Sequence, residues 1–206
     1  MDINRARGFT LLELLVALAI LAILLGIGVP SFAAAIKNSC MSSNQNALVS
    51  SLYLARSEAI KNADSVTVCP RSGSNSQQCG TSWDNGWLVF VDRTQLSNET
   101  TANIDADDEI VNVVDGTCGT STIHGYGSSN RTAAGATPRN FLRYNNRGGT
   151  NWNNGSFVIC DDRGSSDSRA VNIILTGDIR RGFPAGSDST VPQDVFGVDV
   201  TCTPAS

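Results

Sequence analysis

Residues Leu11 to Val29 constrain this chain more than any other part of its sequence. All 19 positions are apolar or glycine except Glu13. A helix rises about 1.5 Å per residue, so this segment spans roughly 28 Å, close to the hydrocarbon thickness of a bilayer. The sequence therefore predicts a helix that can cross a membrane.

The charges around this segment predict its orientation. Arg5 and Arg7 precede it, and the positive-inside rule keeps them in the cytoplasm and places the rest of the chain outside. A secretory signal peptide is the alternative, with cleavage near Ala35 in "VPSFAAAIK". Glu13 counts against that alternative, because a carboxylate in hydrocarbon costs about 2.5 to 3.5 kcal/mol and is by default functional.

The stretch "RGFTLLELLVALAILAILLGIGVPSF" resembles the type III signal of type IV pilins and type II secretion pseudopilins. In that family a membrane peptidase cuts after the glycine and methylates the new N-terminal amine, which implies cleavage between Gly8 and Phe9. In the assembled filament the family's glutamate pairs with the N-terminal amine of a neighbouring subunit. The resemblance thus makes Glu13 an assembly residue and lets Phe9 supply the amine.

Helical periodicity continues beyond the apolar segment to about Asn62. The apolar positions recur at four- and three-residue steps, as expected of a helix that packs one face on a domain: Leu48, Leu52, Ala55 and Ala59. At Pro30, which removes a helical hydrogen bond, we expect a kink or local melting. We divide the chain into a leader (1–8), a transmembrane and filament-core helix (9–30) and a globular head (31–206).

The head is predicted to be mostly strand. β-branched and aromatic residues lie between Gly, Asn and Asp turns at 65–69, 86–92, 109–114, 140–145, 155–161, 170–175 and 195–201. The fold class is therefore α+β, with a long N-terminal helix packed on an antiparallel sheet, which is also the plan of type IV pilins.

Two further motifs resemble the FimT, FimU and GspH group of minor pilins and pseudopilins. The first is "YLARSEAIKNADSVTVCP" followed by the tryptophan-rich "CGTSWDNGWLVFVD". The second is "GSFVICDDRG" followed by "RAVNIILTGDIRR". The resemblance implies a pilin head and a structural role in a filament.

Six cysteines point to disulfides and an oxidising compartment, because none has CxxC or Cys/His metal spacing. The best pair is Cys69 with Cys79, which bracket a polar loop. Cys160 and Cys202 are further candidates. Connectivity, including that of Cys40 and Cys118, cannot be read from sequence.

The sequence gives little support for catalysis. It has one histidine, His124, and no GxSxG or phosphate-binding glycine loop. The acidic "DADDE" at 105–109 lacks EF-hand spacing and is predicted to be a solvated loop. We expect no metal, no cofactor and no small-molecule substrate.

Two groups of arginines are candidates for binding DNA. One lies between Arg131 and Arg147, includes Arg139 and Arg143, and has Phe141, Tyr144 and Trp152 nearby; a solvated loop is the preferred interpretation. The other, Arg180 and Arg181, follows Gly177 and resembles the G-R-x-R motif of competence-type FimT proteins. Asp178 stands at the first arginine of that motif, and its carboxylate would repel phosphate.

The sequence thus predicts a non-enzymatic minor pilin of a type IV pilus, in a tip or priming complex that supports twitching, adhesion or DNA uptake. Its expected partners are other minor and major pilins, the prepilin peptidase and the inner membrane, with the head in the periplasm. The alternatives are a DNA-binding minor pilin for natural transformation and a type II secretion pseudopilin of the GspH type.

Overall fold

Helix α1 (Leu11–Asn62) is continuous through Pro30 in the computed structural model. Of the two outcomes expected at Pro30, local melting is therefore not found. The structure describes residues 9–93, 101–127, 139–150, 154–184, 186 and 189–202. The chain divides into two units, Met1–Ser39 and Cys40–Ser206, so α1 contributes to both.

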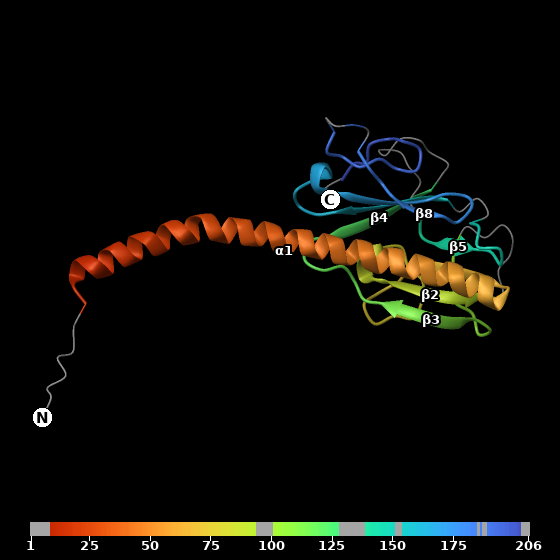
Figure 1. Ribbon diagram of the computed structural model, residues 1–206. Helices are drawn as coiled ribbons and strands as arrows, with labels where there is room; N and C mark the ends of the chain where they lie inside the picture. Colours follow the sequence, from red (N-terminus) through yellow and green to blue (C-terminus); the bar gives the residue numbers. More distant parts are fainter. Residues whose placement is uncertain are drawn as a thin grey trace, which may run out of the picture. The chain divides into compact units, whose positions relative to one another are not determined.

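The head contains two antiparallel four-stranded sheets (Figure 1). The first has the order β3-β2-β1-β5, and the second has the order β4-β6-β7-β8. The strands are β1 (Ser65–Pro70), β2 (Trp87–Asp92), β3 (Glu109–Val114), β4 (Thr122–Gly127), β5 (Leu142–Tyr144), β6 (Gly155–Cys160), β7 (Arg169–Ile173) and β8 (Ile179–Arg181). Two short 3-10 helices, η1 (Trp83–Asn85) and η2 (Ser165–Asp167), precede β2 and β7.

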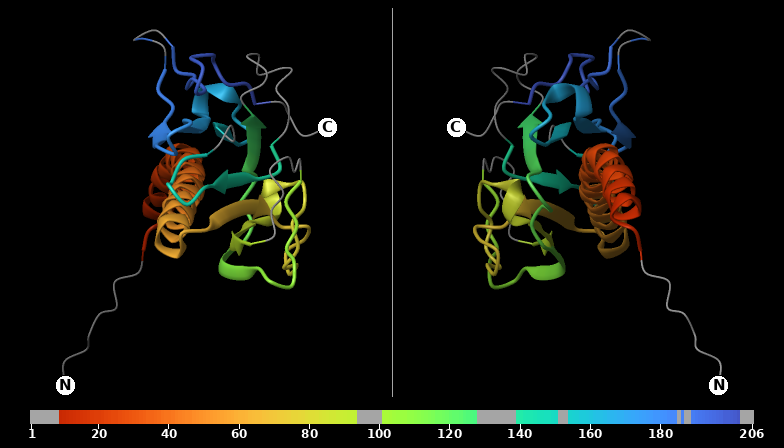
Figure 2. Two further views of the ribbon diagram at one scale, coloured as in Figure 1. Left: turned by 90° about the vertical axis from the view of Figure 1, so that its right-hand side faces the viewer. Right: turned by 90° about the vertical axis from the view of Figure 1, so that its left-hand side faces the viewer.

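The part of α1 that belongs to the head packs one face on both sheets. Its buried residues recur at helical spacing: Met41, Asn44, Gln45, Leu48, Ser51, Leu52, Ala55 and Ala59. The apolar residues of this face share one core with Val68 and Val89 of the first sheet and with Phe157 and Val171 of the second. Figure 2 shows the strands gathered on one side of the helix. The stripe predicted from Leu48 to Ala59 is therefore the buried face of α1.

The buried polar groups of this face have partners. The Ser51 hydroxyl accepts a hydrogen bond from Trp87 Nε1 at 2.9 Å. The Gln45 amide donates to the Ala170 carbonyl at 3.4 Å and accepts from Arg169 at 3.3 Å. These contacts join α1 to one strand in each sheet, so the polar residues also fix its position on the head.

Strands β1, β2 and β6 bury all six of their residues. One face of each contacts the helix-side core, and the other face is covered by a smaller cluster. Cys69, Leu88 and Phe90 pack with Ala102 and Phe141. On the second sheet, Val158 and Cys160 pack with Ala170 and Val200. This double burial explains why β2 reads as the near-continuous apolar run "WLVFV" instead of an alternating one.

Three disulfides join parts of the head that the sheets leave separate. Cys69 bonds to Cys79, which is the pair that the sequence favours. Cys160 at the end of β6 bonds to Cys202 and ties the C-terminal segment to the second sheet. Cys40 in α1 bonds to Cys118, 78 residues away, between β3 and β4. Each bridge restricts the unfolded chain. In the chain-entropy account of disulfides, the bridge that closes the longest loop, Cys40–Cys118, removes the most entropy from the unfolded state.

One predicted strand is wrong, and two strands of the structure were not predicted. The segment 195–201 is not a strand: Asp194 Oδ1 accepts hydrogen bonds from the Phe196 and Val198 amides, at 2.8 and 2.9 Å, and Gly197 has a φ of 79°. A side-chain-stabilised turn replaces the extended backbone. The sequence analysis also missed β4 and β8.

The backbone conformation at Gly86 explains why the tryptophan-rich motif has a glycine at this position. Its φ of 87° and ψ of −172° are in a region that only glycine occupies readily. An added Cβ would also clash with the Val114 carbonyl oxygen and lie 2.7 Å from the Asp115 carbonyl carbon. β2 can therefore begin beside β3 only because this position has no side chain.

We predict that Gly86→Ala destabilises the head more than Gly164→Ala does. Gly164 has a similar φ of 89° and ψ of −163°, but nothing lies within 4 Å of its added Cβ. Both changes carry a backbone cost of about 1–3 kcal/mol, and Gly86→Ala adds an overpacking cost of about 1–3 kcal/mol. Thermal unfolding followed by near-UV circular dichroism compares the two variants, and equal losses would contradict the steric explanation.

Candidate functional site

The unit N-terminal to Cys40 presents apolar side chains on every side. Phe9, Leu11, Leu12 and most other large side chains up to Ile36 are exposed in the isolated chain. α1 is the single helix in the described part of the chain that is long and apolar enough to cross a bilayer, a criterion of length and composition that core helices and signal sequences also meet. A helix that is apolar all round requires lipid or other helices around it.

Glu13 lies in the first turn of this helix. Its backbone N–H donates to Thr10 Oγ1 at 3.2 Å, and Leu14 N–H donates to the Thr10 carbonyl at 3.2 Å. Within the described residues, no hydrogen bond or ion pair reaches the Glu13 carboxylate. The carboxylate lies where a helix N-terminus favours negative charge.

The sequence analysis assigned no role to Thr10. It caps α1, and the spacing Thr10-x-x-Glu13 is the signature of a capping box, so the signal was present in the sequence. The cap uses only the backbone N–H of Glu13, so it does not depend on the carboxylate. Phe9 precedes the cap and is exposed, whereas Gly8 lies outside the described residues.

Arg143 is part of the head's internal structure. Its Nε donates to Thr67 Oγ1 at 2.8 Å and to Asp92 Oδ2 at 3.0 Å, and an ion pair joins Nη2 to the same carboxylate. The two charged side chains are only 11% and 4% exposed. Burial raises the pKa of Asp92, against the opposing effect of Thr67 and Arg143. A phosphate could reach Arg143 only at the cost of this pair.

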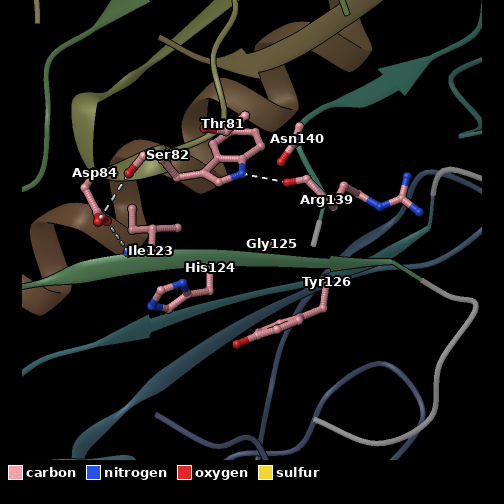
Figure 3. A pocket seen from close by; sticks show the side chains of 10 residues that line it. Thr81, Ser82, Asp84, Ile123, His124, Gly125, Tyr126, Arg139 and Asn140 are labelled. Atoms are coloured by element: carbon pink, nitrogen blue, oxygen red, sulfur yellow. Dashed lines mark hydrogen bonds between the residues drawn. The ribbon is translucent and has the colours of Figure 1, made fainter. Parts of the chain in front are cut away.

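Arg139 lines a cleft of about 280 Å³ beside β4 (Figure 3). Its backbone N–H donates to the Gly125 carbonyl at 2.7 Å, and its carbonyl accepts from Trp83 Nε1 at 2.8 Å. The carboxylate of Asp84 accepts from the Ile123 amide at 2.7 Å. These bonds attach the segment before β5 and the η1 turn to the outer edge of β4.

The rest of the cleft shows no catalytic arrangement. Figure 3 places His124 and Tyr126 on one side of β4 and Arg139 on the other. Burial lowers the pKa of the Arg139 guanidinium and raises the pKa of Tyr126. The Asp84 carboxylate already holds a backbone amide, and the described lining contains no nucleophile paired with a base.

The remaining candidate arginines that the structure describes lie in a turn and on β8. Arg147 lies in a turn, where its amide donates to Asn145 Oδ1 at 2.8 Å. Arg180 and Arg181 are exposed on β8, but Arg180 forms an ion pair with Asp178 at 3.2 Å. Arg181 donates to Asn46 of α1 at 3.4 Å. Arg131 and Trp152 lie outside the described residues.

The acidic segment at 105–109 is held by hydrogen bonds and ion pairs. The Asp108 carboxylate accepts the amides of Arg93 and Asp105, both at 2.9 Å, and Glu109 pairs with Arg93 at 3.1 Å. No cluster of three metal-ligating side chains is present in the described part of the chain.

An apolar helix with a single carboxylate in its first turn, joined to a head of disulfide-linked antiparallel sheets, defines a pilin-like protein. The family model described as "Type II transport protein GspH" matches residues 44–178, and the model of the prokaryotic N-terminal methylation motif matches residues 3–29. The chain belongs to the GspH family. A comparison with curated proteins returned no match.

The chain is also similar to two crystal structures of the type IV minor pilin FimU from Pseudomonas aeruginosa. Sequence identity is 18% and the TM-score is 0.44 in both cases. The alignments cover 72% and 77% of this chain and 98% of FimU.

Proposed function

We propose that this chain is a minor pilin, a structural subunit that the apolar helix holds in the inner membrane until the subunit enters a type IV pilus. In this proposal residues 1–8 are a leader, residues 9–30 span the membrane and then form part of the filament core, and the head faces the periplasm. The observation that carries the proposal is the carboxylate of Glu13, which lies in the first turn of α1 within the matched methylation motif, where every other residue from Leu11 to Val29 is apolar or glycine.

Assembly rests on two physical contributions. Burying the exposed apolar side chains among neighbouring helices keeps them out of water once the subunit has left the bilayer, and apolar surface kept from water is worth about 25 cal/mol per Å². Pairing Glu13 with the amine of Phe9 of a neighbouring subunit sets the axial register, because a charge in an apolar bundle tolerates few positions for its partner. The head then presents its surface to other minor pilins.

The processing step is tested by intact mass and N-terminal sequencing of protein purified from membranes of its native host. We expect a chain that begins at N-methylated Phe9. A chain that begins near Ala35 would support secretion through a cleaved signal peptide, and a chain that retains Met1 would exclude pilin-type processing. Either result would contradict the proposed function.

A type II secretion pseudopilin is the second candidate, and the description of the matched family favours it. The same helix and the same Glu13 would operate in both filaments. Deletion of the gene in the native host separates them: loss of surface pili supports the minor pilin, and loss of an exported enzyme with normal pili supports the pseudopilin.

A further inference from the structure

In the described part of the head the two sheets have four edge strands, and three of them are blocked. β5 and β8 are three residues long and each contains arginine. β4 has six residues, but Asp84 occupies the Ile123 amide and Arg139 occupies the Gly125 carbonyl on its outer side. Short strands, charges and capping contacts are the usual means by which proteins prevent further strand pairing.

β3 is the exception. It has six residues, four of them Ile or Val, and it contains no proline, lysine or arginine. Among the described residues it pairs only with β2. It buries none of its residues, and Val113 is 42% exposed.

The backbone direction at Val113 follows from its neighbour. The Val114 carbonyl oxygen points toward Gly86, on the β2 side, where an added Cβ would clash with it. Because the direction of backbone polar groups alternates along a strand, the N–H and C=O of Val113 point to the outer edge. They are a donor and an acceptor for one more strand.

Negative charge stands at both ends of this edge. Its start carries four acidic residues, Asp105, Asp107, Asp108 and Glu109, and Arg93 is a cation close to them. Asp115 follows its end, and its carboxylate is 99% exposed although it contacts the buried Arg71.

We infer that the outer edge of β3 is a docking site for an extended segment of another protein, with β-branched residues at its centre and Lys or Arg at both ends. The open backbone groups select an extended chain, Val111 and Val113 select β-branched neighbours, and the terminal carboxylates select cations. A second copy of β3 does not fit. Antiparallel pairing would bring Glu109 of each copy beside Asp115 of the other, and parallel pairing would place the Glu109 residues together, and like charges at such positions destabilise a strand pair.

The test uses the full chain in detergent micelles and two synthetic eight-residue peptides. Both have a centre of alternating valine and threonine; one has lysine at each end, and the other has glutamate. Hydrogen exchange read by mass spectrometry locates the bound peptide. We expect the lysine peptide to slow exchange in residues 109–115 but not in β5 or β8, and to bind about tenfold more tightly than the glutamate peptide.

Two variants at Val113 separate backbone pairing from general adhesion. Val113→Pro removes the outward N–H at an edge position where proline is tolerated, so binding of the lysine peptide should be lost. Val113→Thr keeps the N–H and the branched side chain, so binding should remain. If the proline variant fails to fold, the exchange map of the unsubstituted chain still decides.

Three results would overturn the inference. They are equal affinity for the two peptides, protection spread equally over the other edge strands, and concentration-dependent protection of β3 without peptide, which would mean self-pairing. None of them depends on filament assembly, so the inference and the proposed function can fail separately.

Discussion

Replacing Glu13 by alanine should reduce incorporation of the chain into filaments by at least about a hundredfold, since removing one partner of a buried charge pair costs about 3–5 kcal/mol. Glu13 is the only charged residue between Arg7 and Lys37. In the proposed filament its carboxylate compensates the N-terminal amine of a neighbour, and alanine would leave that amine buried without a counter-charge. The measurement is the amount of chain in sheared filaments relative to the amount in the inner membrane.

The matched control is Thr10→Val, because Glu13 also occupies the third position of a capped helix. The capping bond runs from the Glu13 backbone N–H to Thr10 Oγ1, so Glu13→Ala keeps it and Thr10→Val removes it while keeping the carboxylate. Loss of such a cap costs about 1 kcal/mol. We expect the threonine variant to assemble nearly normally. Equal defects in the two variants would mean that assembly depends on the start of the helix as much as on the carboxylate, and would contradict the pairing mechanism.

The same variants test whether the defect is confined to assembly. Residues up to Ser39 form a unit separate from the head, so Glu13→Ala should leave the thermal unfolding of the head unchanged. Filaments that contain the alanine variant at normal levels, or a head that unfolds earlier, would each contradict the mechanism.

The sequence was sufficient to predict the elements whose residues carry a strong periodic pattern. α1 has such a pattern, and β1, β2 and β6 are short runs rich in β-branched and aromatic residues between turns; all four were predicted within two residues. β4 was missed because "TIHGYG" has two glycines and poor strand propensity. Gly125 is required there because an added Cβ would lie 2.8 Å from the Arg139 carbonyl and 3.1 Å from Phe157. Tertiary packing therefore makes β4 a strand against its local preference.

The arginine candidates show a different limit of sequence reasoning. Arg143 lies among arginines in a polar region, and its partner Asp92 is 51 residues away. Nothing in the local pattern indicates that these two meet across β1, because strand order depends on pairings between distant segments. Asp178, by contrast, is two residues from Arg180, and the repulsion that it implies for phosphate could be predicted from sequence.

Replacing Asp92 by alanine should lower the free energy of unfolding by about 3–5 kcal/mol, because the Arg143 guanidinium would stay buried without its counter-ion. Replacing both residues, as in Asp92→Ala with Arg143→Met, should cost less than the single change, because no charge is then left unpaired. Burial raises the pKa of Asp92, so the folded chain holds the proton on this carboxyl more tightly than the unfolded chain does. Its contribution to stability is then greatest below the unfolded pKa and is lost as the pH rises through the folded value. The ionised pair at neutral pH therefore carries a desolvation cost, which is why removing both members is tolerated better than removing one.

Chemical denaturation of the full chain in detergent, for the two single variants and the double variant, measures the coupling between Asp92 and Arg143. Glu109→Gln is the control, because it removes a pair with Arg93 whose side chains are 67% and 43% exposed, and an exposed pair contributes about 0–1 kcal/mol. A double variant that loses as much as the sum of the two single variants would show that Asp92 and Arg143 act independently. The strands that carry them, β2 and β5, would then be linked by the β1–β2 and β1–β5 ladders alone, and Arg143 could leave Asp92 for another anion without unfolding the head.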